Sequence, residues 1–421
     1  MTDSQWLEGY AELAVRVALN LQRGQRLLVI GPLVNGGLSL EAAPLARRIA
    51  ARAYEAGAEL VEAVWGDEAL QLERVRHARP ETLARISDWL PAALEQHARA
   101  GHAVLSVYAN DPDLFRDEPA ERTGALQQAV SRAMVPFRDL VSRNHLNWAT
   151  IAAPSRAWAG KVFPGVPEGQ QVPRLREAIA RMCRLDRPDP VAAWHAHVAK
   201  LAERSAFLNS RRFTALRYTG PGTDLTLGLP AGHIWVSGAS TSRSGIRFVP
   251  NLPTEEVFTI ADRLRVDGAV RSTKPLSYGG SLVEDFTLRF EGGRVAAFAA
   301  VRGEHVLRQM LATDDNAGRL GEVALVPHSS PVAASALLFY NTLFDENAAS
   351  HVALGTAYKF TLEGGEAMTD EEFARAGGNT SAIHVDFMIG SSELDVDGIL
   401  AHGGREPLMR GGEWVDQNLS M

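Results

Sequence analysis

A series of acidic and imidazole side chains runs through the second half of this chain. In chain order, the candidate residues are Glu256, Glu322, Glu346, His351, His384 and Asp386. Carboxylate oxygen and imidazole nitrogen are ligands that zinc, cobalt and manganese accept in proteins, and one carboxylate can give an oxygen to each of two ions. The set therefore predicts a site for two divalent metal ions, at which a bound water can be activated for hydrolysis.

The surroundings of these residues strengthen the prediction. Glu256 is followed by Val257 and Phe258, and His384 and Asp386 lie inside the apolar run Ile-His-Val-Asp-Phe-Met-Ile. An acidic group in a buried strand is costly unless it is paired or coordinates a cation. Because residues two apart on a strand leave the same face, His384 and Asp386 can converge on one metal centre.

Spacing does not support every member of the series. Glu346 and His351 are five residues apart and do not share a helix face well, so their separation alone does not link them. Each carboxylate also has a structural explanation, because a single glutamate in a strand is usually solvated or ion-paired. The prediction therefore depends on the whole set and not on any one residue.

Other catalytic patterns are missing from the sequence. It contains no H-E-x-x-H helix, no G-x-S-x-G elbow and no glycine-rich nucleotide fingerprint. Cys183 is the only cysteine and lies between arginines in Arg-Met-Cys-Arg, which excludes an intrachain disulfide and a thiolate zinc site. Any bound metal must be held by oxygen and nitrogen.

The overall composition limits the remaining function classes. The chain has 421 residues, of which 46% are hydrophobic and 22% charged, and this length favours two domains. Its formal net charge of -7 gives no electrostatic footprint for nucleic acid or an anionic membrane. The sequence shows no signal-peptide pattern and no apolar run long enough to span a bilayer, so we expect a cytoplasmic protein.

The first half alternates between apolar and amphipathic segments. Residues 26–31, 59–65, 102–108 and 148–153 read as buried strands, and helical patterns separate them. Such alternation is typical of parallel strands joined by crossover helices. We therefore predict an N-terminal α/β domain with a mostly parallel sheet over residues 1–190.

The second half has a different character. The prolines at 188 and 190 make a plausible junction, after which a linker helix is expected over 191–209. Short segments punctuated by glycine, such as 223–229, 266–273, 285–290 and 294–300, suggest antiparallel strands joined by tight turns. This pattern predicts an α+β catalytic domain with a largely antiparallel sheet over residues 191–421.

Several long segments of the chain resemble one enzyme family. They are Asn-Leu-Pro-Thr-Glu-Glu-Val-Phe-Thr (251–259), Arg-Leu-Gly-Glu-Val-Ala-Leu-Val-Pro (319–327), Leu-Phe-Tyr-Asn-Thr-Leu-Phe-Asp-Glu-Asn-Ala (338–348), His-Val-Ala-Leu-Gly-Thr-Ala-Tyr (351–358) and His-Val-Asp-Phe-Met-Ile-Gly (384–390). Shorter matches lie at 158–164, 222–229 and 272–276. These segments are similar to those of the metal-dependent aminopeptidases of the aminopeptidase T and aminopeptidase S family.

The resemblance implies a dinuclear site, a homodimer and peptide substrates with a free N-terminus. It implies metal ligands at all six candidate positions and an active-site tyrosine at Tyr358. Glu322 and Asp386 are the candidates for carboxylates that bridge the ions. Tyr358 can donate a hydrogen bond to the developing oxyanion, and Glu255 can act as general base only if the backbone around it is irregular.

The same ligands are compatible with two other interpretations. A dinuclear phosphoesterase would use similar ligands and would add cations for the phosphoryl oxygens, for which Lys161, Arg271 and Lys274 are available. A non-catalytic, metal-stabilised peptide-binding module would have the same ligands without an activated water. For the aminopeptidase we expect broad specificity, with a preference for apolar or basic first residues.

Overall fold

The computed structural model of the chain describes residues 1–278 and 281–415 and divides into two compact units. The N-terminal unit comprises Met1–His197, Ala239–Pro253 and Leu338–Leu343. The C-terminal unit comprises Val198–Gly238, Thr254–Leu337 and Phe344–Met421. Among the described residues, no helix has both the length and the apolar character that crossing a bilayer requires.

A four-stranded parallel sheet forms the centre of the N-terminal unit. Its order is β3 (Leu60–Ala63), β1 (Arg26–Ile30), β5 (Ala103–Tyr108) and β6 (Trp148–Ala152). The strands are short apolar runs because helices cover both faces of such a sheet. The predicted α/β fold with parallel strands is confirmed.

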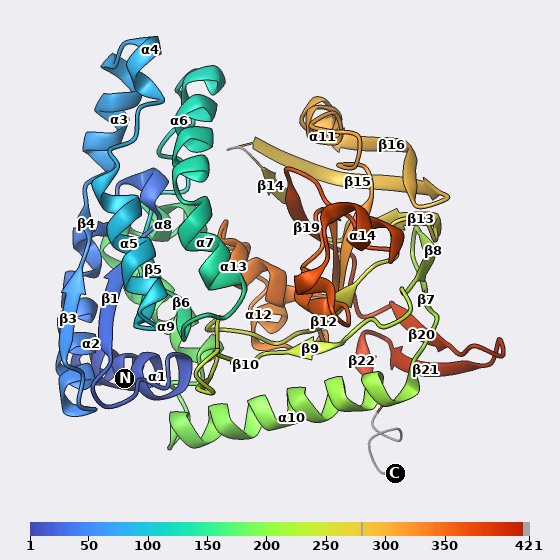
Figure 1. Cartoon of the computed structure of the whole chain (residues 1–421), viewed down its shortest axis with the longest axis horizontal. Coiled ribbons are helices and arrows are strands. Elements are labelled where there is room, and N and C mark those ends of the chain that lie inside the picture. Colours follow the sequence, from blue (N-terminus) through green and yellow to red (C-terminus); the bar gives the residue numbers. More distant parts are fainter. Residues whose placement is uncertain (279–280, 416–421) are drawn as a thin grey trace. The chain divides into compact units, whose positions relative to one another are not determined.

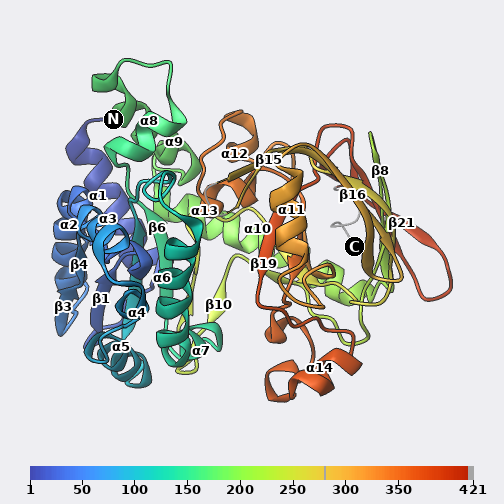
Figure 2. The same ribbon diagram turned by 90° about the horizontal axis from the view of Figure 1, so that it is seen from above.

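Helices surround this sheet. They are α1 (Asp3–Leu13), its π-helical continuation η1 (Ala14–Ala18), α2 (Ala43–Glu55), α3 (Glu68–His77), α4 (Pro80–Leu83), α5 (Trp89–Arg99), α6 (Ala120–Ala133), α7 (Val135–Ser142), α8 (Arg156–Val162) and α9 (Glu168–Met182). Helix α1 packs against α2 (Figures 1 and 2). Side chains of α5 and α7 cluster with Leu28, Ile30 and Val104 of the sheet. Short strands β2 (Leu38–Ser39), β4 (Trp65–Gly66), β10 (Ser240–Thr241) and β11 (Arg247–Phe248) complete the unit.

Helix α10 (Pro190–Arg211) leads into the C-terminal unit, which contains two antiparallel sheets. The nine-stranded sheet is made of β7 (Ala215–Gly220), β8 (Thr223–Gly228), β13 (Val266–Arg271), β14 (Leu276–Tyr278), β15 (Ser281–Glu291), β16 (Arg294–Arg302), β20 (Asp395–Ile399), β21 (Arg405–Arg410) and β22 (Glu413–Trp414). The five-stranded sheet has the order β19 (His384–Met388), β18 (His351–Gly355), β17 (Leu320–Leu325), β12 (Val257–Ile260) and β9 (Val236–Ser237). Short helices α11 (Glu304–Leu311), α12 (Pro331–Ala334), α13 (Thr342–Asp345) and α14 (Asp370–Arg375) connect the strands. The predicted largely antiparallel second half is confirmed.

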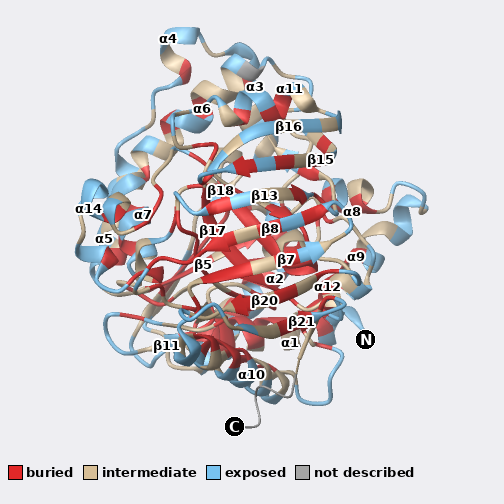
Figure 3. Cartoon of the chain, turned by 90° about the vertical axis from the view of Figure 1, so that its right-hand side faces the viewer, coloured by how far each residue is buried: buried red, intermediate tan, exposed pale blue. Residues whose placement is uncertain are grey.

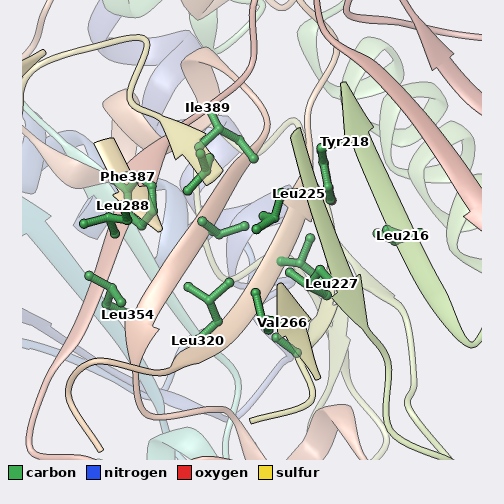
Figure 4. Close-up of a cluster of buried hydrophobic side chains, with 14 of the residues drawn as sticks. Leu216, Tyr218, Leu225, Leu227, Val266, Leu288, Leu320, Leu354, Phe387 and Ile389 are labelled. Carbon is green, nitrogen blue, oxygen red and sulfur yellow. The ribbon is translucent and has the colours of Figure 1, made fainter. Parts of the chain in front are cut away.

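One face of the five-stranded sheet packs into the core of the C-terminal unit. Leu354 and Phe387 point into a buried cluster that also contains Leu225 and Leu288 of the nine-stranded sheet (Figure 4), and Val323 belongs to the same cluster. Strands β17 and β18 are buried along their whole length (Figure 3). Because side chains alternate along a strand, the residues between these apolar ones point to the opposite face of the sheet.

Candidate metal centre

The five-stranded sheet carries five of the six predicted ligands on or directly beside its strands. Glu256 immediately precedes β12, Glu322 lies on β17, His351 begins β18, and β19 holds both His384 and Asp386. The sixth, Glu346, begins the short 3-10 helix η4 (Glu346–Ala348), which precedes β18. Residues from 256 to 386 thus meet on one sheet of one unit.

Strand register places these side chains on a common face. Glu322 of β17 is paired with Ala353 of β18, and Ala353 is paired with Asp386 of β19. His351 precedes Ala353 by two residues and His384 precedes Asp386 by two, so both imidazoles leave the same face. The pairing of β17 with β18 shifts register between Leu320 and Glu322, directly before the Glu322–Ala353 pair. Bulges of this kind are common beside active sites, where they redirect a side chain.

A small residue separates the two carboxylates. Ala353 lies between Glu322 and Asp386 in the register and is fully buried. We expect Ala353→Leu to lower metal affinity at least about tenfold without removing a ligand, because the larger side chain fills the volume over the sheet. Isothermal titration of stripped protein with Zn²⁺ measures this. Ala353→Ser is the matched control and should bind within about threefold of wild type, whereas equal binding by both variants would contradict the assignment of this face.

The ligand atoms form two overlapping groups. In each of the triads Glu256–Glu322–His351 and Glu322–His384–Asp386, one ligand atom per residue lies within 4.8 Å of the others. His351 Nε2 is 3.8 Å from Glu322 Oε1, while His384 Nε2 is 3.8 Å from Glu322 Oε2. Glu322 therefore presents a different oxygen to each imidazole, which is the arrangement that a bridging carboxylate requires.

The remaining contacts complete each group. His351 Nε2 lies 3.2 Å from Glu256 Oε2, and His384 Nε2 lies 3.4 Å from Asp386 Oδ1. Glu256, Glu322 and His351 are buried. Asp386 Oδ1 is also buried, yet within the described residues it makes no hydrogen bond of acceptable geometry. Such an atom is costly to bury unless a positive charge, from protonated His384 or from a metal ion, balances it.

Backbone carbonyls orient both imidazoles. The Nδ1 atom of His351 lies 3.1 Å from the carbonyl oxygen of Ala349, and that of His384 lies 2.8 Å from the carbonyl oxygen of Thr356. A carbonyl can only accept, so each Nδ1 donates and each Nε2 is left to offer its lone pair to an ion. Metal-binding histidines usually have this outer partner.

The charges of the cluster depend strongly on one another. Burial raises the pKa of the Glu322 carboxyl, and burial together with the negative charge of Glu256 raises that of Glu346 well above its ordinary value. Burial alone would lower the pKa of His384, but Asp386 and Glu322 outweigh it and raise the value to about 10. For His351 the same balance, set by Glu256 and Glu322, raises the pKa well above its usual range. Protons therefore offset part of the carboxylate charge that a cation would neutralise.

Tyr358 and Glu346 lie within reach of this charge. Burial, followed by the negative charges of Glu322 and Asp386, raises the pKa of Tyr358 well above its usual value. Because the residue as a whole is 38% exposed, the neighbouring carboxylates account for this direction better than burial does. The Tyr358 and His384 ring centroids are 4.9 Å apart. Glu346 interacts electrostatically with Glu256, Asp386, His351 and Glu322, and thus lies beside the cluster.

Glu255 lies in the irregular backbone that precedes β12 and is buried. Its backbone N–H donates to Asn347 Oδ1 over 2.6 Å. The backbone around Glu255 is therefore irregular, as a role as general base would require. That role stays a prediction.

Asn347 is a residue that the sequence did not single out. Its side chain is completely buried, and its backbone carbonyl oxygen accepts a hydrogen bond of 2.8 Å from Ser330 Oγ. Asn347 thus connects η4, the 3-10 helix that begins at Glu346, to the segment that contains Glu255 and Glu256. The only sequence signal was its place directly after Glu346.

The cations considered for a phosphoesterase are not grouped at this centre. The Arg271 guanidinium pairs with Asp285 at 2.7 Å, and Lys161 of the N-terminal unit pairs with Asp113 at 2.9 Å. Lys274 lines a pocket formed by the ends of other strands, and the predicted ligands are not among its lining residues. Two of the three charges are thus already balanced by carboxylates.

The chain is similar to known aminopeptidases along nearly its whole length. It is 46% identical over 409 residues to Aminopeptidase 2 of Geobacillus stearothermophilus, covering 97% of each chain. It is also 46% identical to Aminopeptidase T of Thermus thermophilus, covering 97% of this chain and 98% of the relative. The solved structure of wild-type AmpT from Thermus thermophilus matches with a TM-score of 0.92 and 46% identity, covering 98% of this chain and all of that one.

The family model described as thermophilic metalloprotease (M29) matches residues 3–414. This span includes every element of both units and all candidate site residues. The resemblance that the sequence segments predicted is confirmed, and the chain belongs to the M29 family of thermophilic metalloproteases.

Proposed function

We propose that this chain is a two-metal aminopeptidase that releases N-terminal residues from peptides. The observation that carries the proposal is the position of Glu322, whose two carboxylate oxygens face two different histidines. Membership of the M29 family makes the chain a peptide-bond hydrolase and supports peptide substrates over phosphate esters or a purely structural site.

The donor set fits a pair of divalent ions. Glu256 and His351 would hold one ion, His384 and Asp386 the other, and Glu322 would bridge them. Asp386 is a second candidate for a carboxylate shared between the ions, and Glu346 is the candidate for a sixth ligand. Ions bound there would lower the pKa of a coordinated water and polarise the scissile carbonyl. Oxygen and nitrogen ligands suit zinc, cobalt and manganese alike.

The surrounding side chains would orient the peptide and move its protons. The raised pKa of Tyr358 keeps its hydroxyl protonated near neutral pH, so it can donate a hydrogen bond to the developing oxyanion. Glu255 is the candidate for the general base. The carboxylates of the centre can bind a protonated or metal-coordinating α-amino group, which explains why a free N-terminus would be required.

A direct comparison of substrates tests this proposal. Metal-loaded protein should hydrolyse leucine p-nitroanilide, should not hydrolyse the N-acetylated form, and should leave p-nitrophenyl phosphate intact. Chelation should abolish the amide hydrolysis, and added metal should restore it. Faster hydrolysis of the phosphate ester would support the phosphoesterase alternative, and metal binding without any hydrolysis would support the binding module.

A homodimer is expected as well, because enclosing the site by a second subunit would keep folded proteins away from it. Sedimentation should give the mass of a dimer at micromolar concentration. A fully active monomer would contradict this expectation. The cytoplasmic location expected from the sequence stays a prediction.

A further inference from the structure

Three aromatic side chains form a patch beside the metal centre. This aromatic patch consists of Phe258, Tyr358 and Phe360. The Tyr358 and Phe360 rings are stacked with centroids 5.3 Å apart, and Phe258 meets both edge-on at 6.3 and 6.2 Å. All three side chains are at least partly exposed, and Tyr358 exposes 38% of its surface. Because apolar surface is costly to leave in water, a partly exposed aromatic cluster at a catalytic centre points to a ligand.

The patch borders both groups of ligands. Phe258 lies on β12, two residues after Glu256, and it is paired with Ala324, which is paired in turn with His351. At the other group, the ring of Tyr358 lies 4.9 Å from the ring of His384. The aromatic surface therefore adjoins the position where a scissile carbonyl would bind.

The segment that carries two of these rings is firmly anchored. Between Tyr358 and Phe360, the Lys359 ammonium lies 2.9 Å from Asp370 and donates to the carbonyl oxygen of Met368. The Thr361 hydroxyl donates to the carbonyl oxygen of Tyr358 over 2.6 Å. These bonds hold the polar side chains of the segment, while the two aromatic rings stack within 20° of parallel.

We infer that the aromatic patch binds the side chain of the first residue of the substrate and selects for apolar side chains. In an aminopeptidase, the side chain of the first residue is attached to the α-carbon, which is bonded to the scissile carbonyl carbon. This side chain must therefore lie directly beside the metal centre. The patch offers ring surface there, and the neighbouring carboxylates would repel an acidic side chain. This inference rests on the proposed function and names the surface that would give it specificity.

Phe360→Ala tests the inference through a ratio of substrates. The ratio of kcat/KM for leucine p-nitroanilide to that for glycine p-nitroanilide should fall at least about tenfold. Only the leucine substrate has a side chain that would lose its contact with the ring. Phe360→Leu should restore most of the ratio, since it returns apolar surface. Phe298→Ala is the matched control, because Phe298 is a partly buried phenylalanine of β16 in the nine-stranded sheet, and its ratio should not change.

Metal content and melting temperature show whether each variant is folded and loaded, and Phe258→Ala gives a second test if Phe360→Ala does not fold. An equal loss for both substrates would overturn the inference, since it would indicate a positioning role only. An unchanged ratio in both alanine variants would overturn it too. The proposed function fails separately, if metal-loaded wild type hydrolyses neither amide.

Discussion

Replacing His384 or Asp386 with alanine is expected to lower kcat/KM for leucine p-nitroanilide by at least about a thousandfold, which corresponds to about 4 kcal/mol of transition-state stabilisation. The two residues leave one face of β19, and their ligand atoms lie 3.4 Å apart. Losing either would leave one ion without a proper ligand set. Because the core lies on the opposite face of the sheet, the fold should survive.

Each variant is compared with the wild type by steady-state kinetics for activity, by elemental analysis for metal content and by circular dichroism for folding. His305→Ala is the matched control for the histidine, since His305 is exposed on α11. It should retain full activity and metal content. A folded His384→Ala or Asp386→Ala variant with wild-type kinetics would contradict the assignment.

Glu322→Gln is expected to weaken the binding of both ions, and to do so more than the loss of either histidine. The amide keeps the shape of the side chain but has only one oxygen, so it cannot give an oxygen to each ion. Glu322 belongs to both ligand groups, whereas His351 and His384 each belong to one. Turnover should fall at least about a thousandfold, as for loss of the metal pair.

Metal stoichiometry after equilibration at one low, buffered concentration of free Zn²⁺ distinguishes these cases. We expect nearly two ions in the wild type, about one in His351→Ala, and close to none in Glu322→Gln. A Glu322→Gln variant that still holds two ions with unchanged affinity would show that Glu322 is not shared.

Much of the fold could be predicted from local patterns. The apolar runs of the first half are typical of parallel strands, and glycine-punctuated alternation in the second half is typical of antiparallel ones. Segments 239–253 and 338–343, however, belong to the N-terminal unit although they lie late in the sequence. Periodicity reports only local geometry, so it could not reveal this association.

The same limit applies to the candidate metal centre. The period of a strand is enough to place His384 and Asp386 on one face, but the pairing of Glu322 with Ala353, and of Ala353 with Asp386, depends on register between distant strands. Tyr358 was identified only through the family resemblance, and Phe258 only through the structure. The outer partners of the histidines are backbone carbonyls, which carry no sequence signal.

Metal titration of stripped protein tests the central claim most directly. The protein is depleted of metal, its metal content is measured, and leucine p-nitroanilide hydrolysis is followed as Zn²⁺, Co²⁺ or Mn²⁺ is added. We predict no measurable hydrolysis without metal, and full activity only when about two equivalents per chain are bound, because Glu322 links two ligand groups. Full activity in protein shown to contain no metal, or a plateau at one equivalent, would contradict a two-metal aminopeptidase.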